Sequence, residues 1–189
     1  MRKIDTINKL KSMGLKVAEA REFKASDIKE MLSYANHLIQ KYGTFNLRTD
    51  LPETSQAGTN LPFIMNCTIS KLMNLIKERG DSITYIIHQH FDVKKQLFNG
   101  TLRVIDNQLV GEINELDKTS QRVGMLNAAN LKQVSDPGTN PVFKQIKQDI
   151  LNSGQDAWFE LTAFNDGSIV YWQIVPEKLT PKLKKIFLQ

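Results

Sequence analysis

The sequence predicts an α+β protein in which antiparallel hairpins alternate with helices. Two observations carry this prediction. Segments with the period of amphipathic helices dominate the first part of the chain, and short runs rich in β-branched and aromatic residues dominate the rest. The strand-like runs come in neighbouring pairs joined by short turns, and such pairs are antiparallel. Helices packed against antiparallel sheets are therefore the expected architecture.

Helix signals recur along the chain, and a glycine follows each of the first four helical segments, as is common at helix C-termini. The fourth segment has Asn140 at its cap and Pro141 at its first helical position, a combination typical of helix starts. The expected helices are residues 5–13, 26–43, 69–79 and 140–154, and a short basic helix from Thr180 to Gln189.

Strand signals follow a different pattern, with Ile, Val, Phe, Tyr and Trp concentrated in short runs. The strongest hairpin signal is Asp166-Gly167, which predicts a two-residue type I′ turn that pairs Asn165 with Ser168. The polar segment 119–138 shows no period and is either a flap over a site or a plain surface connection. The expected strands are residues 45–48, 83–91, 100–105, 109–113, 157–164 and 169–175.

The composition of the 189 residues, 41% hydrophobic and 24% charged, is that of an ordinary soluble globular protein and excludes collagen-like and disordered classes. No run is long enough for a membrane span, and the N-terminus lacks a signal-peptide core, which predicts a cytoplasmic protein without a membrane partner. The net charge of +5 weakly favours anionic partners, but nucleic acid is not favoured, because the basic residues form no single face. Cys67 stands alone among apolar neighbours, which favours a buried structural thiol over a catalytic one.

Glu160 interrupts an apolar strand, where an ionised carboxylate is costly unless something neutralises it. Counting back from the turn places Glu160 directly opposite Gln173, another polar interruption, on one sheet face. Carboxylate and amide oxygens suit Mg²⁺, so the pair is a candidate for half of a magnesium site. The alternatives are a Glu–Gln hydrogen bond, or a carboxylate at the sheet edge that faces water.

Two further segments contain residues suited to ligands. Arg48 precedes a loop rich in hydroxyls and small residues, which together offer donors to phosphate oxygens. The alternative is an exposed connection. His88 and His90 project from one face of a strand, which allows two imidazoles on one metal, but no third ligand is evident and a half-exposed strand face is favoured.

These segments, in this order, resemble the ATP-grasp nucleotide-binding domain of pyruvate phosphate dikinase and phosphoenolpyruvate synthase. Residues 47–58 are similar to the family's V-R-S-S-x-x-x-E-D…S-x-A-G stretch, residues 87–91 to its V-Q-x-M-V strand end, and residues 99–102 to its Ser-Gly-Val strand. Residues 159–176 are similar to the most specific motif, which is I-E-W/F-A, a short glycine turn and a strand that ends in Q-x-R-P.

The resemblance implies a bound ATP. Arg48, with Thr49 beside it, would grip the phosphates and act as the catalytic cation. The hinge on the adenine side would consist of Gln89, His90 and Phe91.

The same resemblance implies that Glu160 and Gln173 hold the Mg²⁺ that accompanies the nucleotide, the pair that the hairpin count also brings together. The chain departs from the family in lacking G-G-K-G, where Lys3 stands only at the corresponding spacing, and in having Val175 in place of the arginine of Q-x-R-P. The phosphohistidine and phosphoenolpyruvate-binding domains are missing as well. These departures concern γ-phosphate chemistry more than nucleotide binding.

The expected protein is a two-lobe ATP-grasp-like fold, with an N-terminal lobe at 1–82 and a C-terminal lobe at 83–189. Its expected function is ATP binding, with possible Mg-dependent phosphoryl transfer to an unidentified small-molecule or protein acceptor, as in a kinase, another phosphotransferase or a ligase. A nucleotide-sensing module without turnover, and a small interaction protein without a ligand, are the alternatives. The oligomeric state is not encoded legibly.

Overall fold

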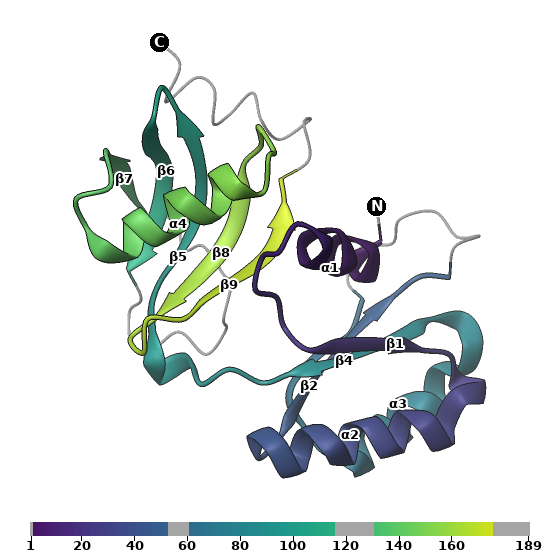
Figure 1. Cartoon of the computed structure of the whole chain (residues 1–189). Helices are drawn as coiled ribbons and strands as arrows, with labels where there is room; N and C mark the ends of the chain where they lie inside the picture. Colours follow the sequence, from purple (N-terminus) through teal and green to yellow (C-terminus); the bar gives the residue numbers. More distant parts are fainter. Residues whose placement is uncertain (1, 53–60, 116–130, 176–189) are drawn as a thin grey trace. The chain divides into compact units, whose positions relative to one another are not determined.

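The computed structural model describes residues 2–52, 61–115 and 131–175 (Figure 1). The chain forms two compact units, one made of Met1–Asp5 with Ala18–Phe91 and the other of Thr6–Val17 with Asp92–Gln189. The first helix, α1 (Lys3–Ser12), therefore contributes its start to one unit and its remainder to the other. The α+β class with antiparallel sheets is confirmed.

The first unit contains a four-stranded antiparallel sheet with strand order β1-β4-β2-β3, and helices α2 and α3 lie on the same face of it (Figure 1). The left-handed conformation of Gly43 ends α2, and the Thr68 hydroxyl caps α3 by accepting from the backbone N–H of Lys71. The elements of the unit are β1 (Ala20–Phe23), α2 (Ile28–Tyr42), β2 (Phe45–Asp50), β3 (Phe63–Cys67), α3 (Ile69–Arg79) and β4 (Thr84–Gln89).

The core of the first unit lies between those helices and the sheet. Strand residues of alternate position, such as Leu47, Tyr85 and Ile87, point toward α2 and α3 and are fully buried. Because side chains alternate across a strand, the residues between them occupy the opposite face of the sheet. β4 pairs with both β1 and β2, and it is thus counted with the first unit, although the lobe boundary expected from the sequence lies just before it.

The second unit contains a five-stranded antiparallel sheet with strand order β7-β6-β5-β8-β9. Helix α4, capped by the Asn140 side chain with Pro141 after it, packs on one face of this sheet and buries Ile146 and Ile150. Leu10 and Leu15, from α1 and the segment after it, complete that core. The elements are β5 (Gln96–Ile105), β6 (Gln108–Glu115), β7 (Leu131–Asp136), α4 (Pro141–Asn152), β8 (Phe159–Phe164) and β9 (Ile169–Ile174).

The four longer helices expected from the sequence are confirmed, as are six of the observed strands. Three strands, β1, β3 and β7, were not expected, and β7 occupies residues 131–136 of the segment taken as aperiodic. The rest of that segment up to residue 130, the loop at 53–60 and the helix expected at 180–189 lie outside the described residues. None of the helices that the structure describes is long and apolar enough to span a membrane.

Candidate functional site

In the first unit, polar side chains gather on the sheet face that α2 and α3 leave free. Arg48 and Asp50 of β2 lie on this face, and their cross-strand neighbours on β4 are Ile86 and Thr84. Arg48 is half-buried, and its guanidinium carbon lies 5.0 Å from the centre of the Phe63 ring on β3. A guanidinium held against an aromatic ring keeps its edge donors oriented, which suits it to a planar anionic ligand.

His88 lies beside this arginine and is only 4% exposed. Its ring is parallel to the Phe63 ring, with the centroids 6.3 Å apart, and its Nδ1 lies 3.0 Å from the carbonyl oxygen of Gln89. Burial first, and then the charge of Arg48, lower the pKa of His88 to about 3. The imidazole is therefore neutral at physiological pH, with Nδ1 as the donor.

The half-exposed strand face expected for His88 is thus wrong, because its side chain is almost fully buried and its ring stacks on that of Phe63. His90 contacts a different neighbour. Its Nδ1 lies 3.2 Å from Oδ1 of Asn46, and the described residues contain no group of three His, Cys, Asp or Glu side chains placed to hold a metal ion.

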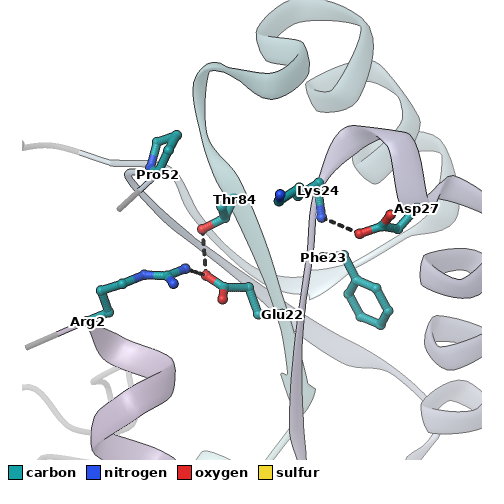
Figure 2. Close-up of a pocket in the computed structure, with 7 residues that line it drawn as sticks. All are labelled: Arg2, Glu22, Phe23, Lys24, Asp27, Pro52 and Thr84. Carbon is teal, nitrogen blue, oxygen red and sulfur yellow. Dashed lines mark hydrogen bonds and ion pairs between the residues drawn. The ribbon is translucent and has the colours of Figure 1, made fainter. Parts of the chain in front are cut away.

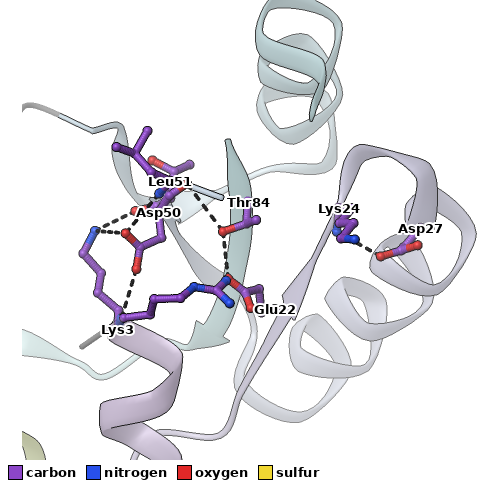
Figure 3. A network of polar contacts seen from close by, with 9 residues as sticks. Lys3, Glu22, Lys24, Asp27, Asp50, Leu51 and Thr84 are labelled. Atoms are coloured by element: carbon purple, nitrogen blue, oxygen red, sulfur yellow. Dashed lines mark hydrogen bonds and ion pairs between the residues drawn. The ribbon is translucent and has the colours of Figure 1, made fainter. Parts of the chain in front are cut away.

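Lys3 lies at the other end of the same sheet face (Figure 3). Its ammonium donates to the carbonyl oxygen of Thr49 at 2.6 Å and lies 3.9 Å from the Asp50 carboxylate, while its backbone N–H donates to that carboxylate at 2.9 Å. Burial lowers the pKa of Lys3, and the charge of Asp50 opposes the shift. Thr49 itself is 1% exposed and donates its hydroxyl to the Pro62 carbonyl, so its part in nucleotide binding stays a prediction.

The expected hinge residues stand at the point where the chain leaves the first unit. Gln89 ends β4, and its backbone N–H donates to the carbonyl oxygen of Glu19 at 2.8 Å. The Gln89 side-chain oxygen lies 3.5 Å from the backbone nitrogen of Glu19. Phe91 is the last residue of the unit. The structure therefore brings Arg48 and Gln89 into one sheet, and their roles toward a ligand stay predictions.

A pocket of about 470 Å³ lies in the same unit, and its lining includes Thr84, the cross-strand neighbour of Asp50 (Figure 2). Glu22 is central to it, because this carboxylate forms an ion pair with Arg2 and accepts from the Thr84 hydroxyl at 2.7 Å. On the opposite side, the backbone N–H of Lys24 donates to the Asp27 carboxylate at 2.9 Å. None of the site residues expected from the sequence lines this pocket, because β1, which carries Glu22, was not recognised as a strand.

In the second unit, Glu160 of β8 pairs directly with Gln173 of β9, as the hairpin count predicts. The turn that produces this pairing differs from the prediction. The N–H of Phe164 donates to the carbonyl of Ser168 and the N–H of Gly167 to the carbonyl of Phe164, so the loop has three residues, with Gly167 left-handed at φ +79°. Because the loop has one residue more than predicted, the pairs next to it are offset by one position from the predicted register. A bulge at Trp172 removes this offset, so that Glu160 again pairs with Gln173.

Glu160 is half-buried, and its surroundings are less apolar than its strand alone indicates. The register aligns Thr101 of β5 with Glu160, and Glu112 of β6 with Thr101. Asn99 lies on the same face of β5, since it is two residues from Thr101. The face of this sheet away from α4 therefore has a polar strip around Glu160. Its sequence signal was the alternation of polar residues at positions 99, 101 and 103.

No protein-family model matches the sequence, and no curated protein matches it. Solved structures do match the fold. The D-alanine-D-alanine ligase from Helicobacter pylori has a TM-score of 0.57 and 16% identity, with 96% of this chain and 56% of that chain covered. The corresponding ligase from Coxiella burnetii has a TM-score of 0.57 and 13% identity, with 92% of this chain and 47% of that chain covered.

A third match is N5-carboxyaminoimidazole synthetase from Staphylococcus aureus complexed with ADP, at a TM-score of 0.53 and 16% identity, with 93% of this chain and 44% of that chain covered. The chain thus spans about half the length of these structures. All three are ATP-grasp proteins. They do not support the narrower resemblance to the dikinase type, since they are ligases and a synthetase. At these identities the likeness concerns the fold, and this chain has the α+β ATP-grasp fold.

Proposed function

We propose that this chain binds ATP together with Mg²⁺, and that the bound ATP serves phosphoryl transfer to an acceptor. The observation that carries the proposal is the direct cross-strand pairing of Glu160 with Gln173, on a polar sheet face of an ATP-grasp fold. Side chains that face each other in this way have their Cβ atoms about 5 Å apart, so both oxygens can reach one ion.

The donor set fits magnesium. Mg²⁺ usually takes one or two carboxylates from a protein and draws its other ligands from phosphates and water. Glu160 supplies one carboxylate, Gln173 an amide oxygen, and neither side chain is fully buried, so both are within reach of a ligand. When bound, Mg²⁺ neutralises phosphate charge that builds up during transfer.

The other roles fall to residues of the first unit. Arg48 would offer its guanidinium edge to phosphate oxygens, since stacking on Phe63 already limits its freedom. Gln89, His90 and Phe91 would contact the base. Catalysis of this kind depends on positioning and charge neutralisation rather than on a strong general base. Because the similar structures are ligases and a synthetase, we favour a carboxylate acceptor over a hydroxyl one.

A second candidate function is nucleotide binding without turnover. Val175, which replaces the arginine of the family's Q-x-R-P motif, is 8% exposed and packs with Trp158 and Val110. The Lys3 ammonium, the nearest counterpart of the family's lysine, is held by the Thr49 carbonyl and by Asp50. Of the two cations that would act on the γ-phosphate, the arginine is replaced by Val175, and the lysine, Lys3, is already bound to the Thr49 carbonyl and Asp50. This favours a binding module.

Isothermal titration calorimetry of the full chain with ATP, in the presence of Mg²⁺ and then of EDTA, tests binding. We expect affinity that depends on Mg²⁺ in the wild type, and loss of that dependence in Glu160→Gln. Glu30→Gln removes the same charge from an exposed position on α2 and serves as the control. No heat in the wild type, or a Glu160→Gln variant that keeps the full Mg²⁺ dependence, would contradict the proposal.

Turnover needs a separate measurement. Release of ADP from MgATP, followed by a coupled spectroscopic assay, separates the enzyme from the binding module. ADP formation above the level of the Glu160→Gln variant supports phosphoryl transfer, and binding without ADP formation supports the second candidate.

A further inference from the structure

A short chain of hydrogen bonds crosses the polar face of the second sheet and ends on Asn99. The indole N–H of Trp172 donates to the Thr162 hydroxyl oxygen at 2.7 Å, and the Thr162 hydroxyl donates to Oδ1 of Asn99 at 2.6 Å. Thr162 is fully buried and Asn99 is 2% exposed, so the chain is enclosed.

This chain of donors determines which way the Asn99 amide points. The Thr162 oxygen already accepts the indole proton, so its own proton must go to an acceptor, and Asn99 has to present Oδ1 rather than Nδ2. Rotating the amide would leave the Thr162 proton without an acceptor. The two N–H donors of Asn99 are therefore directed away from Thr162.

The Asn99 amide nitrogen is buried and has no hydrogen-bond partner among the residues that the structure describes. A buried donor that stays unsatisfied costs about 1–3 kcal/mol, so such groups are rare unless a ligand satisfies them. On the same face of β5, Thr101 follows two residues later, and it is the cross-strand neighbour of Glu160. The unsatisfied donors thus lie one step along the sheet from the Glu160–Gln173 pair.

We propose that Asn99 is a ligand-binding residue whose amide N–H donates to an anionic oxygen of the molecule held at Glu160 and Gln173. Glu160 has only acceptor oxygens, and the Gln173 oxygen that would bind the cation does not donate to the phosphates. Asn99 supplies the missing donor. Trp172 and Thr162 are positioning residues, since they act by fixing the amide. Because Nδ2 is enclosed, the ligand has to displace the atoms that cover it. This inference rests on the proposed function.

Two substitutions of Asn99 test it in calorimetric titrations of the full chain with MgATP. Asn99→Leu has nearly the same size and removes the donors, and we expect its affinity to fall at least tenfold, the worth of one hydrogen bond to a charged group. Asn99→Asp keeps the acceptor for Thr162 but places a negative charge where the donors were. Its affinity should fall further than that of Asn99→Leu, because like charges then face each other.

Gln133→Glu is the matched control, since it adds one negative charge to the same sheet face at an exposed position on β7, opposite Glu112. It should leave the MgATP affinity within about twofold of wild type, because it changes none of the hydrogen-bond donors of Trp172, Thr162 and Asn99. Trp172 fluorescence reports whether each variant keeps the folded hydrogen-bond chain. Asn99→Leu removes the unsatisfied donors but also the acceptor of the buried Thr162 hydroxyl, so its urea unfolding is measured beside the titration and only variants that stay folded are compared.

The outcomes separate this inference from the proposed function. Wild-type binding with unchanged affinity in folded Asn99→Leu overturns the role of Asn99 alone. If Asn99→Leu and Asn99→Asp lose the same MgATP affinity, the ligand atom that accepts from Asn99 carries no charge, and the proposed anionic oxygen is wrong. If Gln133→Glu loses as much affinity as the Asn99 variants, the loss is not specific to Asn99, and the proposal is wrong as well. A wild type that binds no MgATP overturns both the proposed function and the role of Asn99.

Discussion

The enclosed histidine of the first unit predicts a specific loss of stability in acid. The pKa of His88 is lowered from 6.5 to about 3 in the folded protein, whereas the unfolded chain keeps the ordinary value. Between these pH values the unfolded state binds a proton that the folded state does not, so stability is fully present above pH 6.5 and falls as the pH falls. At pH 5 the loss amounts to about 2 kcal/mol, and at pH 7.5 it is close to zero.

The change that isolates this effect is His88→Gln, which replaces the titrating ring by a neutral amide. Urea unfolding of wild type and variant is followed at pH 7.5 and pH 5. The two tryptophans, Trp158 and Trp172, both belong to the second unit and do not report on His88. Far-UV circular dichroism, together with hydrogen exchange of peptides from β2 and β4, is therefore the appropriate measurement.

We expect the wild type to lose about 2 kcal/mol more than His88→Gln between the two pH values, with the difference confined to the first unit. The other histidines and the carboxylates titrate in both proteins and cancel in the comparison. An equal loss in both proteins would mean that His88 takes up its proton in the folded state, and the assignment of a neutral, enclosed imidazole would be wrong.

Three further predictions concern single positions. Gly111 has φ +147°, and a Cβ added there would lie 2.1 Å from the carbonyl oxygen of Thr101, so Gly111→Ala should cost about 3 kcal/mol or more in urea unfolding monitored by tryptophan fluorescence. Gly154→Ala, with open space at φ +66°, should cost about 1 kcal/mol, and equal costs would contradict the clash. Burial raises the pKa of the Cys67 thiol to about 11, so a disulfide reagent at pH 7.5 should label it only in urea; rapid labelling of the native protein would show an accessible thiolate. Arg48→Lys should weaken MgATP binding about tenfold in calorimetry, because an ammonium cannot reproduce the guanidinium fork, and unchanged affinity would remove this residue from the site.

The pairing of Glu160 with Gln173 could be predicted because a hairpin is local. The Asp-Gly turn fixes where the chain reverses, so a count along the two strands gives an approximate register without any long-range information. The count succeeded even though the turn has three residues, because the bulge at Trp172 offsets the extra one. Nothing in the two strand sequences announces that bulge, so the agreement depended on a feature that the pattern does not contain.

The strands that were not recognised, β1, β3 and β7, are all at sheet edges. An edge strand has one neighbour and a partly solvated face, so its sequence does not need the apolar alternation that marks a central strand. β1 contains only four residues with two charges among them, and β7 is largely polar. The pocket around Glu22 was missed for the same reason.

The sequence by itself determined the positions of the longer helices, the central strands and the polar interruptions at Glu160, Gln173 and Arg48, because propensity, capping and periodicity are properties of neighbouring residues. Tertiary structure alone decided which side chains from strands distant in the sequence share a face. Asn99, Thr101 and Glu112 join Glu160 only through pairing of β5 with β6 and β8, and His88 is neutral because the fold buries it and places Arg48 near it. Burial and pairing between distant segments depend on the whole fold, and no local pattern encodes them.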